Sequence, residues 1–221
     1  MNMNQNIWFT ADTHLGHRNI LKYLGRPFMN NEEQEQLAYA QTQGRKAVQT
    51  VRIGDASIQL HDSTIIDNIN ASVQTGDLLY ILGDFCMGRL DEVRYYRNKI
   101  NCNNVFLIRG NHDKLRDNEY KQVFNNIKDL DRVRWNEQQI ILCHYPMLRW
   151  NNGHYGSWQL YGHCHGTLQD YLIQHDLQNL LSMDVGVDCH NYSPISIEDV
   201  KQIMMQKKPD LILEEEIKTE A

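Results

Sequence analysis

The chain has 221 residues, of which 41% are hydrophobic and 23% are charged, a balance typical of a soluble globular protein. Its formal net charge of −6 argues against a broad basic face for duplex nucleic acid, although a phosphate could still bind at a local positive centre. No apolar run is long enough to span a membrane, and there is no secretory leader pattern. Five irregularly spaced cysteines favour a reducing compartment, so we expect a cytoplasmic protein.

Apolar runs and helical patterns alternate along the chain, which indicates an α/β fold. Buried strands are expected at residues 7–11, 78–82, 105–108, 139–143, 158–161 and 181–187. Helices are expected from Asp62 or Ser63 to about Val73, at 89–100, from Asp113 to about Ile127, and at 196–205. In residues 46–61, apolar residues alternate around Gly54-Asp55, which predicts an inserted β-hairpin. We expect one domain over residues 1–206, followed by a charged tail at 207–221.

Polar residues that can bind metals follow five of the expected strands. In open α/β sheets, ligands bind where the strands end. A single histidine after a strand is more often a surface residue, but five such strand ends are hard to explain as solvated turns. Two divalent ions that clamp a phosphate need a bridging carboxylate, further oxygen donors and several imidazoles. The residues that offer these groups are Asp12, His14, Asp84, Asn111, His112, Asp113, His144, His163 and His165.

The ordered set of short motifs resembles the calcineurin-like metallophosphoesterases. The strings "GHRNI", "RPF", "HYPM" and "MDVGVD", which begin at Gly16, Arg26, His144 and Met183, are similar to small bacterial and phage members of that family. The resemblance spans residues 7 to about 190. Its core motifs are Asp12-Thr13-His14, Gly83-Asp84, Gly110-Asn111-His112-Asp113, His144 and Gly162-His163-Cys164-His165.

The resemblance implies a fold, two metal ions and a set of roles. The implied fold has two packed mixed β-sheets flanked by helices, in four α/β/β/α layers. Asp84 is expected to bridge two divalent ions, with manganese as the first choice and iron, zinc, nickel or cobalt as alternatives. His112 is expected to protonate the leaving oxygen, oriented by Asp113. The remaining ligands are expected to be Asp12, His14 and His165 for the first ion, and Asn111, His144 and His163 for the second.

Substrate contacts are expected from two places. His17 and Arg18 follow the first ligands and either bind the phosphate or support the ligands from behind. The loop at residues 145–157 contains Tyr145, Arg149 and Trp150, which either stack on a flat group of the substrate or simply cover the edge of the core.

Three residue groups have simpler interpretations. We expect Cys143, Cys164 and Cys189 to be buried thiols. Asp188 and His190 are expected to support the ligands rather than bind metal, and Arg109 is expected to pair with a carboxylate.

These observations predict a dinuclear metal-dependent phosphoesterase. A phosphodiesterase that acts on a nucleotide-type or other small phosphodiester is favoured, with the metal centre supplying the attacking hydroxide. Two alternatives remain: a non-catalytic scaffold on the same fold, and a nuclease acting on short single strands. The partner is a small phosphate ester, with no duplex nucleic acid and no membrane expected. The sequence leaves the oligomeric state and the natural substrate open.

Overall fold

The structure of the protein is a computed structural model that describes residues 5–207. Its first sheet has the strand order β4-β3-β2-β1-β9, and only β9 runs antiparallel to its neighbour. Alternate residues of β1, β2 and β3 face opposite sides, as the pleat of a strand requires. The strands are β1 (Ile7–Thr10), β2 (Leu78–Ile81), β3 (Asn104–Ile108), β4 (Asn126–Lys128) and β9 (Ile195–Ser196).

The second sheet has the order β5-β6-β7-β8, with β5 antiparallel and the other pairs parallel. A hydrophobic cluster joins the two sheets, and it includes Phe9 and Leu82 from the first sheet and Leu142 and Leu160 from the second. The expectation of two packed mixed sheets flanked by helices is confirmed. The strands are β5 (Leu130–Trp135), β6 (Gln138–Cys143), β7 (Trp158–Tyr161) and β8 (Ser182–Asp184).

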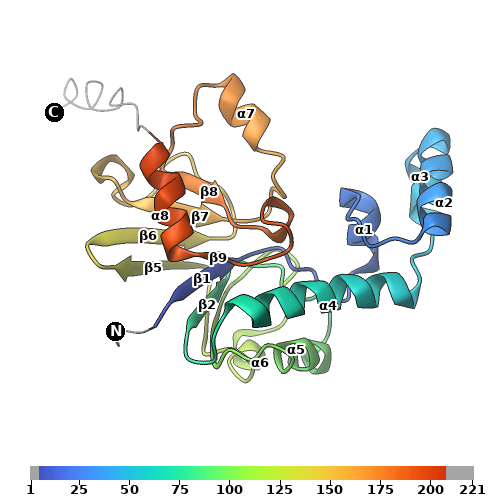
Figure 1. Ribbon diagram of the computed structural model, residues 1–221, viewed down its shortest axis with the longest axis horizontal. Helices are drawn as coiled ribbons and strands as arrows, with labels where there is room; N and C mark the ends of the chain where they lie inside the picture. Colours follow the sequence, from blue (N-terminus) through green and yellow to red (C-terminus); the bar gives the residue numbers. More distant parts are fainter. Residues whose placement is uncertain (1–4, 208–221) are drawn as a thin grey trace.

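Helices cover the outer face of the first sheet and extend beyond it (Figure 1). A second cluster packs Ile65 and Ile69 of α4 and Val93 of α5 against Leu79 and Leu107 of the sheet. In Figure 1, α1, α2 and α3 gather beside the N-terminal half of α4, away from both sheets. The helices are α1 (Arg18–Leu24), α2 (Asn31–Gln43), α3 (Arg45–Thr50), α4 (Asp55–Ser72), α5 (Leu90–Arg97), α6 (Asp117–Tyr120), α7 (Gln169–Gln174) and α8 (Ile197–Gln206).

The predicted β-hairpin at residues 46–61 is wrong. The segment contains most of α3, a short connection, and the first two turns of α4. Gly54 is the residue before α4, not the centre of a hairpin turn. Its N–H donates to the Glu33 carboxylate (2.6 Å), and Ile53 and Ile58 both join a small cluster with Leu21. These contacts with α1 and α2 select the helix.

The predicted helix that begins at Asp113 is also wrong. Only Asp117–Tyr120 is helical, and Ile127 belongs to β4, which pairs with β3. The apolar residues Tyr120, Phe124 and Ile127 are all buried, as a helix with one apolar face would require. The pairing of β4 with β3, however, makes the segment around Ile127 a strand.

The charged tail was predicted at residues 207–221, and residues 208–221 of it lie outside the described part of the chain. Over residues 5–207, no helix is both long and apolar enough to cross a membrane.

Candidate metal centre

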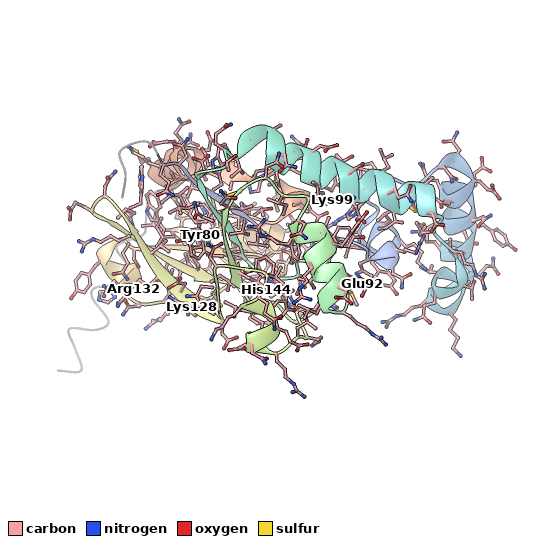
Figure 2. The ribbon with its side chains drawn as sticks, turned by 90° about the horizontal axis from the view of Figure 1, so that it is seen from below. Tyr80, Glu92, Lys99, Lys128, Arg132 and His144 are labelled. Atoms are coloured by element: carbon pink, nitrogen blue, oxygen red, sulfur yellow. The ribbon has the colours of Figure 1, made fainter. Side chains whose placement is uncertain are left out.

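Strand ends from both sheets bring carboxylates and imidazoles together. Asp12 and His14 follow β1, Asp84 follows β2, and His144, which Figure 2 labels, follows β6. The side chains of these four residues are almost completely buried. Two groups have ligand atoms that all lie within 4.8 Å of one another: Asp12, His14 and His165, and Asp12, Asp84 and His144. Asp12 is therefore shared between two overlapping clusters.

Each of the two central carboxylates has one oxygen engaged and one free. Asp12 Oδ2 accepts the backbone N–H of His163 (2.8 Å), whereas Asp12 Oδ1 is buried with no hydrogen-bond partner. Asp84 Oδ1 accepts the N–H of His112 (2.7 Å). Its Oδ2 lies 3.6 Å from the Nε2 atoms of both His14 and His144. Two atoms bound to one ion at about 2.1 Å each lie roughly 3–3.5 Å apart, so the observed 3.6 Å is only slightly longer than shared coordination requires.

The imidazoles are oriented by their second nitrogen. His144 Nδ1 lies 2.7 Å from the carbonyl of Leu82, which can only accept, so this nitrogen carries the proton and Nε2 is free to bind a cation. His165 Nδ1 makes the same kind of contact with Asp188 Oδ2 (2.7 Å). Asn111 Oδ1 lies 3.1 Å from His144 Nε2, in reach of the same ion.

The electrostatics also favour a bound cation. Burial, and then the nearby Asp184 and Asp84 carboxylates, raise the pKa of Asp12 well above its usual value. Burial also lowers the pKa values of His14 and His144, so both imidazoles are neutral and can act as ligands. Both nitrogens of His14 are buried without a hydrogen-bond partner. A divalent cation would stabilise the carboxylates and occupy the free imidazole nitrogens, so these residues fit a metal centre.

The backbone at the site is strained. Five of the candidate ligands, which are Asp12, His14, Asp84, His163 and His165, have φ between 47° and 70°, the left-handed region that residues other than glycine rarely occupy. Such conformations persist where the surrounding structure imposes them, commonly at functional sites. Close packing adds a further constraint: a Cβ at Gly110 would collide with the Asp84 carboxylate.

His112 lies beside this cluster, with its ring centroid 5.3 Å from that of His14. The predicted pairing of His112 with Asp113 is not what the structure shows. The Asp113 carboxylate instead accepts the backbone N–H groups of Gly110 (2.8 Å), Asp84 (2.9 Å) and Phe85 (3.2 Å). Asp113 therefore joins the segment after β2 to the segment after β3, and it positions Asp84 through the main chain.

The five expected substrate residues divide into two groups. His17 and Tyr145 lie at the site: the ring of His17 is 5.5 Å from His14, and the ring of Tyr145 is 4.9 Å from His163. Arg18 instead pairs with Asp55 and donates to the carbonyl of Ile53 (3.0 Å).

The other two belong to the loop at 145–157. Trp150 Nε1 donates to the carbonyl of Ser157 (3.0 Å), so its indole is engaged within the loop. Arg149 is exposed.

Sequence reasoning missed Arg26 and His61, which lie fully buried behind the cluster. The string "RPF" contains Arg26, but this string alone does not indicate a role for the arginine. Asp188 was expected to support the ligands, and its contact with His165 agrees with that. Arg109 pairs with Asp129 (3.1 Å) and Asp117, as expected. Cys189 is exposed rather than buried, which corrects that expectation, and Cys143 and Cys164 are half-buried.

Comparison with known proteins identifies the family. The family model described as calcineurin-like phosphoesterase matches residues 5–218. The chain belongs to this family. Its members are metal-dependent phosphoesterases, and the buried Asp and His clusters are consistent with a metal site typical of the family.

Similar proteins support the fold. An uncharacterized protein of Methanocaldococcus jannaschii, MJ1445, is 27% identical over 205 residues, covering 91% of this chain and 93% of that protein. The crystal structure of AQ665, a protein of unknown function from Aquifex aeolicus, has a TM-score of 0.61 at 21% identity and covers 90% of this chain and 100% of that chain. The E. coli phosphoesterase YfcE is 15% identical over 73% of this chain and 70% of its own, and its TM-score of 0.33 is too low to support a conclusion.

Proposed function

We propose that the protein is a dinuclear metal-dependent phosphodiesterase. The observation that carries the proposal is the set of free ligand atoms: each buried carboxylate has one oxygen engaged by the backbone and the other directed at imidazole nitrogens. Asp12, His14 and His165 would hold one ion, Asn111, His144 and His163 would hold the other, and Asp84 would contribute to both. Two such ions would supply an activated water and neutralise the phosphate oxygens.

The protein's own residues would orient the substrate and move the proton. His112 lies at the edge of the cluster and is only partly buried, so a substrate oxygen can reach it. It would donate a proton to the departing oxygen, a contribution of roughly 10²–10⁴-fold in rate. His17, whose ring centroid is 6.1 Å from that of His112, would contact the phosphate from the same side.

The substrate proposed is a small phosphodiester of nucleotide type. Tyr145 supports this choice, because the residue is 44% exposed while its ring packs edge-on against His144 and His163, next to the ligand atoms. An exposed aromatic ring in that position can stack on a base. The net charge of −6 disfavours long nucleic acids, whose backbone requires a basic surface. The cysteines are all free, which suits a reducing compartment, and we propose the cytoplasm.

The test is a screen of the metal-depleted protein against metals and esters. Manganese, iron, zinc, nickel and cobalt should each be added to samples containing phosphomonoesters, bis-nitrophenyl phosphate, and cyclic and linear nucleotides. The proposal expects metal-dependent turnover that is faster on diesters than on monoesters, with manganese among the active metals. A matched Asp84→Asn variant controls for contaminating enzymes. Absence of turnover with every metal would favour the scaffold alternative, and faster turnover of monoesters would contradict the diester preference.

A further inference from the structure

The guanidinium of Arg26 is buried, and all of its N–H groups donate hydrogen bonds. Arg26 is 1% exposed, and it lies just after α1 in the "RPF" string. A guanidinium has five N–H donors, and each of them has a partner here. The partners are Asp188 Oδ1 (from Nε, 2.8 Å), Asp188 Oδ2 (from Nη2, 2.7 Å), the carbonyl of Asp12 (from Nη2, 2.8 Å), the carbonyl of Thr13 (from Nη1, 3.3 Å) and His61 Nε2 (from Nη1, 2.7 Å).

The first arm of this network leads to His165. Arg26 grips Asp188 with two parallel hydrogen bonds, the geometry that only an arginine fork provides. Asp188 Oδ2 also accepts from His165 Nδ1 (2.7 Å), which leaves His165 Nε2 free toward the metal cluster. The Asp188 carboxylate is therefore held in place by hydrogen bonds from both Arg26 and His165.

The second arm leads to the segment after β1. Asp12 and His14 have φ of 57° and 47°, so both residues lie in the left-handed region of backbone conformation. The carbonyls of Asp12 and Thr13 accept from Arg26, which satisfies two buried groups that this turn would otherwise leave without partners. The same guanidinium therefore contacts the segment that carries Asp12 and the carboxylate that holds His165.

The third arm leads to α4. An arginine cannot accept a hydrogen bond, so His61 Nε2 accepts and its Nδ1 carries the proton. That proton is donated to Asp62 Oδ1 (2.8 Å). Asp62 in turn accepts the N–H of Gly16 (3.1 Å) and the hydroxyl of Tyr96 (2.7 Å). The neutral His61 thus ties the guanidinium to a helix packed on the first sheet.

We propose that Arg26 is a positioning residue of the metal centre, which sets His165 and Asp12 at the spacing that one ion requires. The proposal rests on the proposed ligand roles of Asp12 and His165. It accounts for the "RPF" and "MDVGVD" strings together, because Arg26 and Asp188, which are 162 positions apart, form one ion pair. Neither residue belongs to the two candidate ligand groups.

The test compares conservative variants by their metal affinity. Arg26→Lys keeps the charge but has only three donors and no fork, and Asp188→Asn has a single accepting oxygen for Arg26 and His165. The matched control is Arg97→Lys, since Arg97 also binds main-chain carbonyls, those of Ile100 (3.1 Å) and Cys102 (2.8 Å), but away from the site. Manganese titration and the absorption spectrum of the cobalt-substituted protein measure the binding of the two ions without relying on activity.

We expect Arg26→Lys and Asp188→Asn to bind one of the two ions about 10–100-fold more weakly, with the other ion little affected. Excess metal should restore much of kcat in both variants, and Arg97→Lys should behave as the wild type. If Arg26→Lys does not fold, Asp188→Asn, whose side chain is 13% exposed, carries the test.

Several outcomes would overturn this role. Wild-type affinity for both ions in the two variants would do so, as would an equal weakening of both ions that Arg97→Lys shares. A His165→Ala variant separates the two proposals. If it loses an ion while Arg26→Lys does not, only the role of Arg26 is wrong. If it binds both ions normally, the proposed ligand set is wrong, and the role of Arg26 falls with it.

Discussion

The Asp84→Asn variant should be more stable than the wild type without metal and less stable than the wild type with metal. Asp84 is 2% exposed, and its Oδ2 atom lies 3.6 Å from the Nε2 atoms of His14 and His144. Its charge is one of the causes, after burial and Asp184, that raise the pKa of Asp12. Without metal, this carboxylate is therefore destabilising. Asparagine keeps the oxygen that accepts from the His112 N–H while it removes the charge.

The magnitude follows from these contacts. Asparagine replaces a buried charge with a neutral amide, and we expect this to relieve about 1–3 kcal/mol, the usual cost of an uncompensated buried polar group. For a protein of this size, each kcal/mol shifts Tm by roughly 2–4 °C, so the metal-free variant should melt about 2–12 °C above the wild type. Metal at a hundredfold excess over Kd adds about 2.7 kcal/mol per ion, or roughly 10–20 °C in Tm for two ions, and the variant should lose most of that gain.

Thermal melts with EDTA and with manganese measure all four values. Asp91→Asn is the matched control, because its side chain is 95% exposed and should leave both melting temperatures unchanged. If the metal-free Asp84→Asn protein melts below the wild type and still gains the full metal-induced shift, Asp84 is neither a destabilising charge nor a metal ligand.

The remaining predictions concern the residues around the cluster. His112→Ala should retain both metals but lose roughly 10²–10⁴-fold in turnover with poor leaving groups and much less with nitrophenyl esters; equal losses on both would reject the proton-donor role. Tyr145→Ala should bind nucleotide-type diesters about ten- to a hundredfold more weakly without affecting bis-nitrophenyl phosphate. Trp150→Ala should instead lower Tm, since the indole of Trp150 is hydrogen-bonded within its own loop. An unchanged Tm with weaker binding of nucleotide-type diesters would make Trp150 the stacking residue. Burial, and then His112 and Arg26, lower the pKa of His17 to about 4, so the unfolded chain binds the proton more tightly and stability is lost as pH falls from 6.5 toward 4. Urea unfolding of the metal-free protein at pH 7 and pH 5 should show a smaller loss for His17→Asn than for the wild type, and an equal loss would contradict this.

The strands and the clustering at their ends could be predicted because both depend on local information. A buried strand requires a continuous apolar run. A metal site at the end of such a strand requires acidic and imidazole side chains there. All six expected strands are present, and Asp12, His14, Asp84, His144 and His165 come together as expected.

The segment before α4 could not be predicted in the same way. Val51, Ile53, Ile58 and Leu60 alternate as a strand would, and short apolar runs of this kind do not distinguish strand from helix. In the structure Ile53 and Ile58 are buried against α1, whereas Leu60 is 54% exposed. The deciding contact, between Glu33 and Gly54, is 21 positions apart. The Arg26 and Asp188 pair was hidden for the same reason, because nothing local links the two residues.

A crystal structure of the manganese-loaded protein would show whether these residues hold a pair of ions. Anomalous diffraction should show two peaks about 3.5–4 Å apart. Asp84 should lie between them, with Asp12, His14 and His165 around one peak and Asn111, His144 and His163 around the other. A single peak, or two peaks whose nearest side chains lie elsewhere, would show that these residues do not hold a pair of ions.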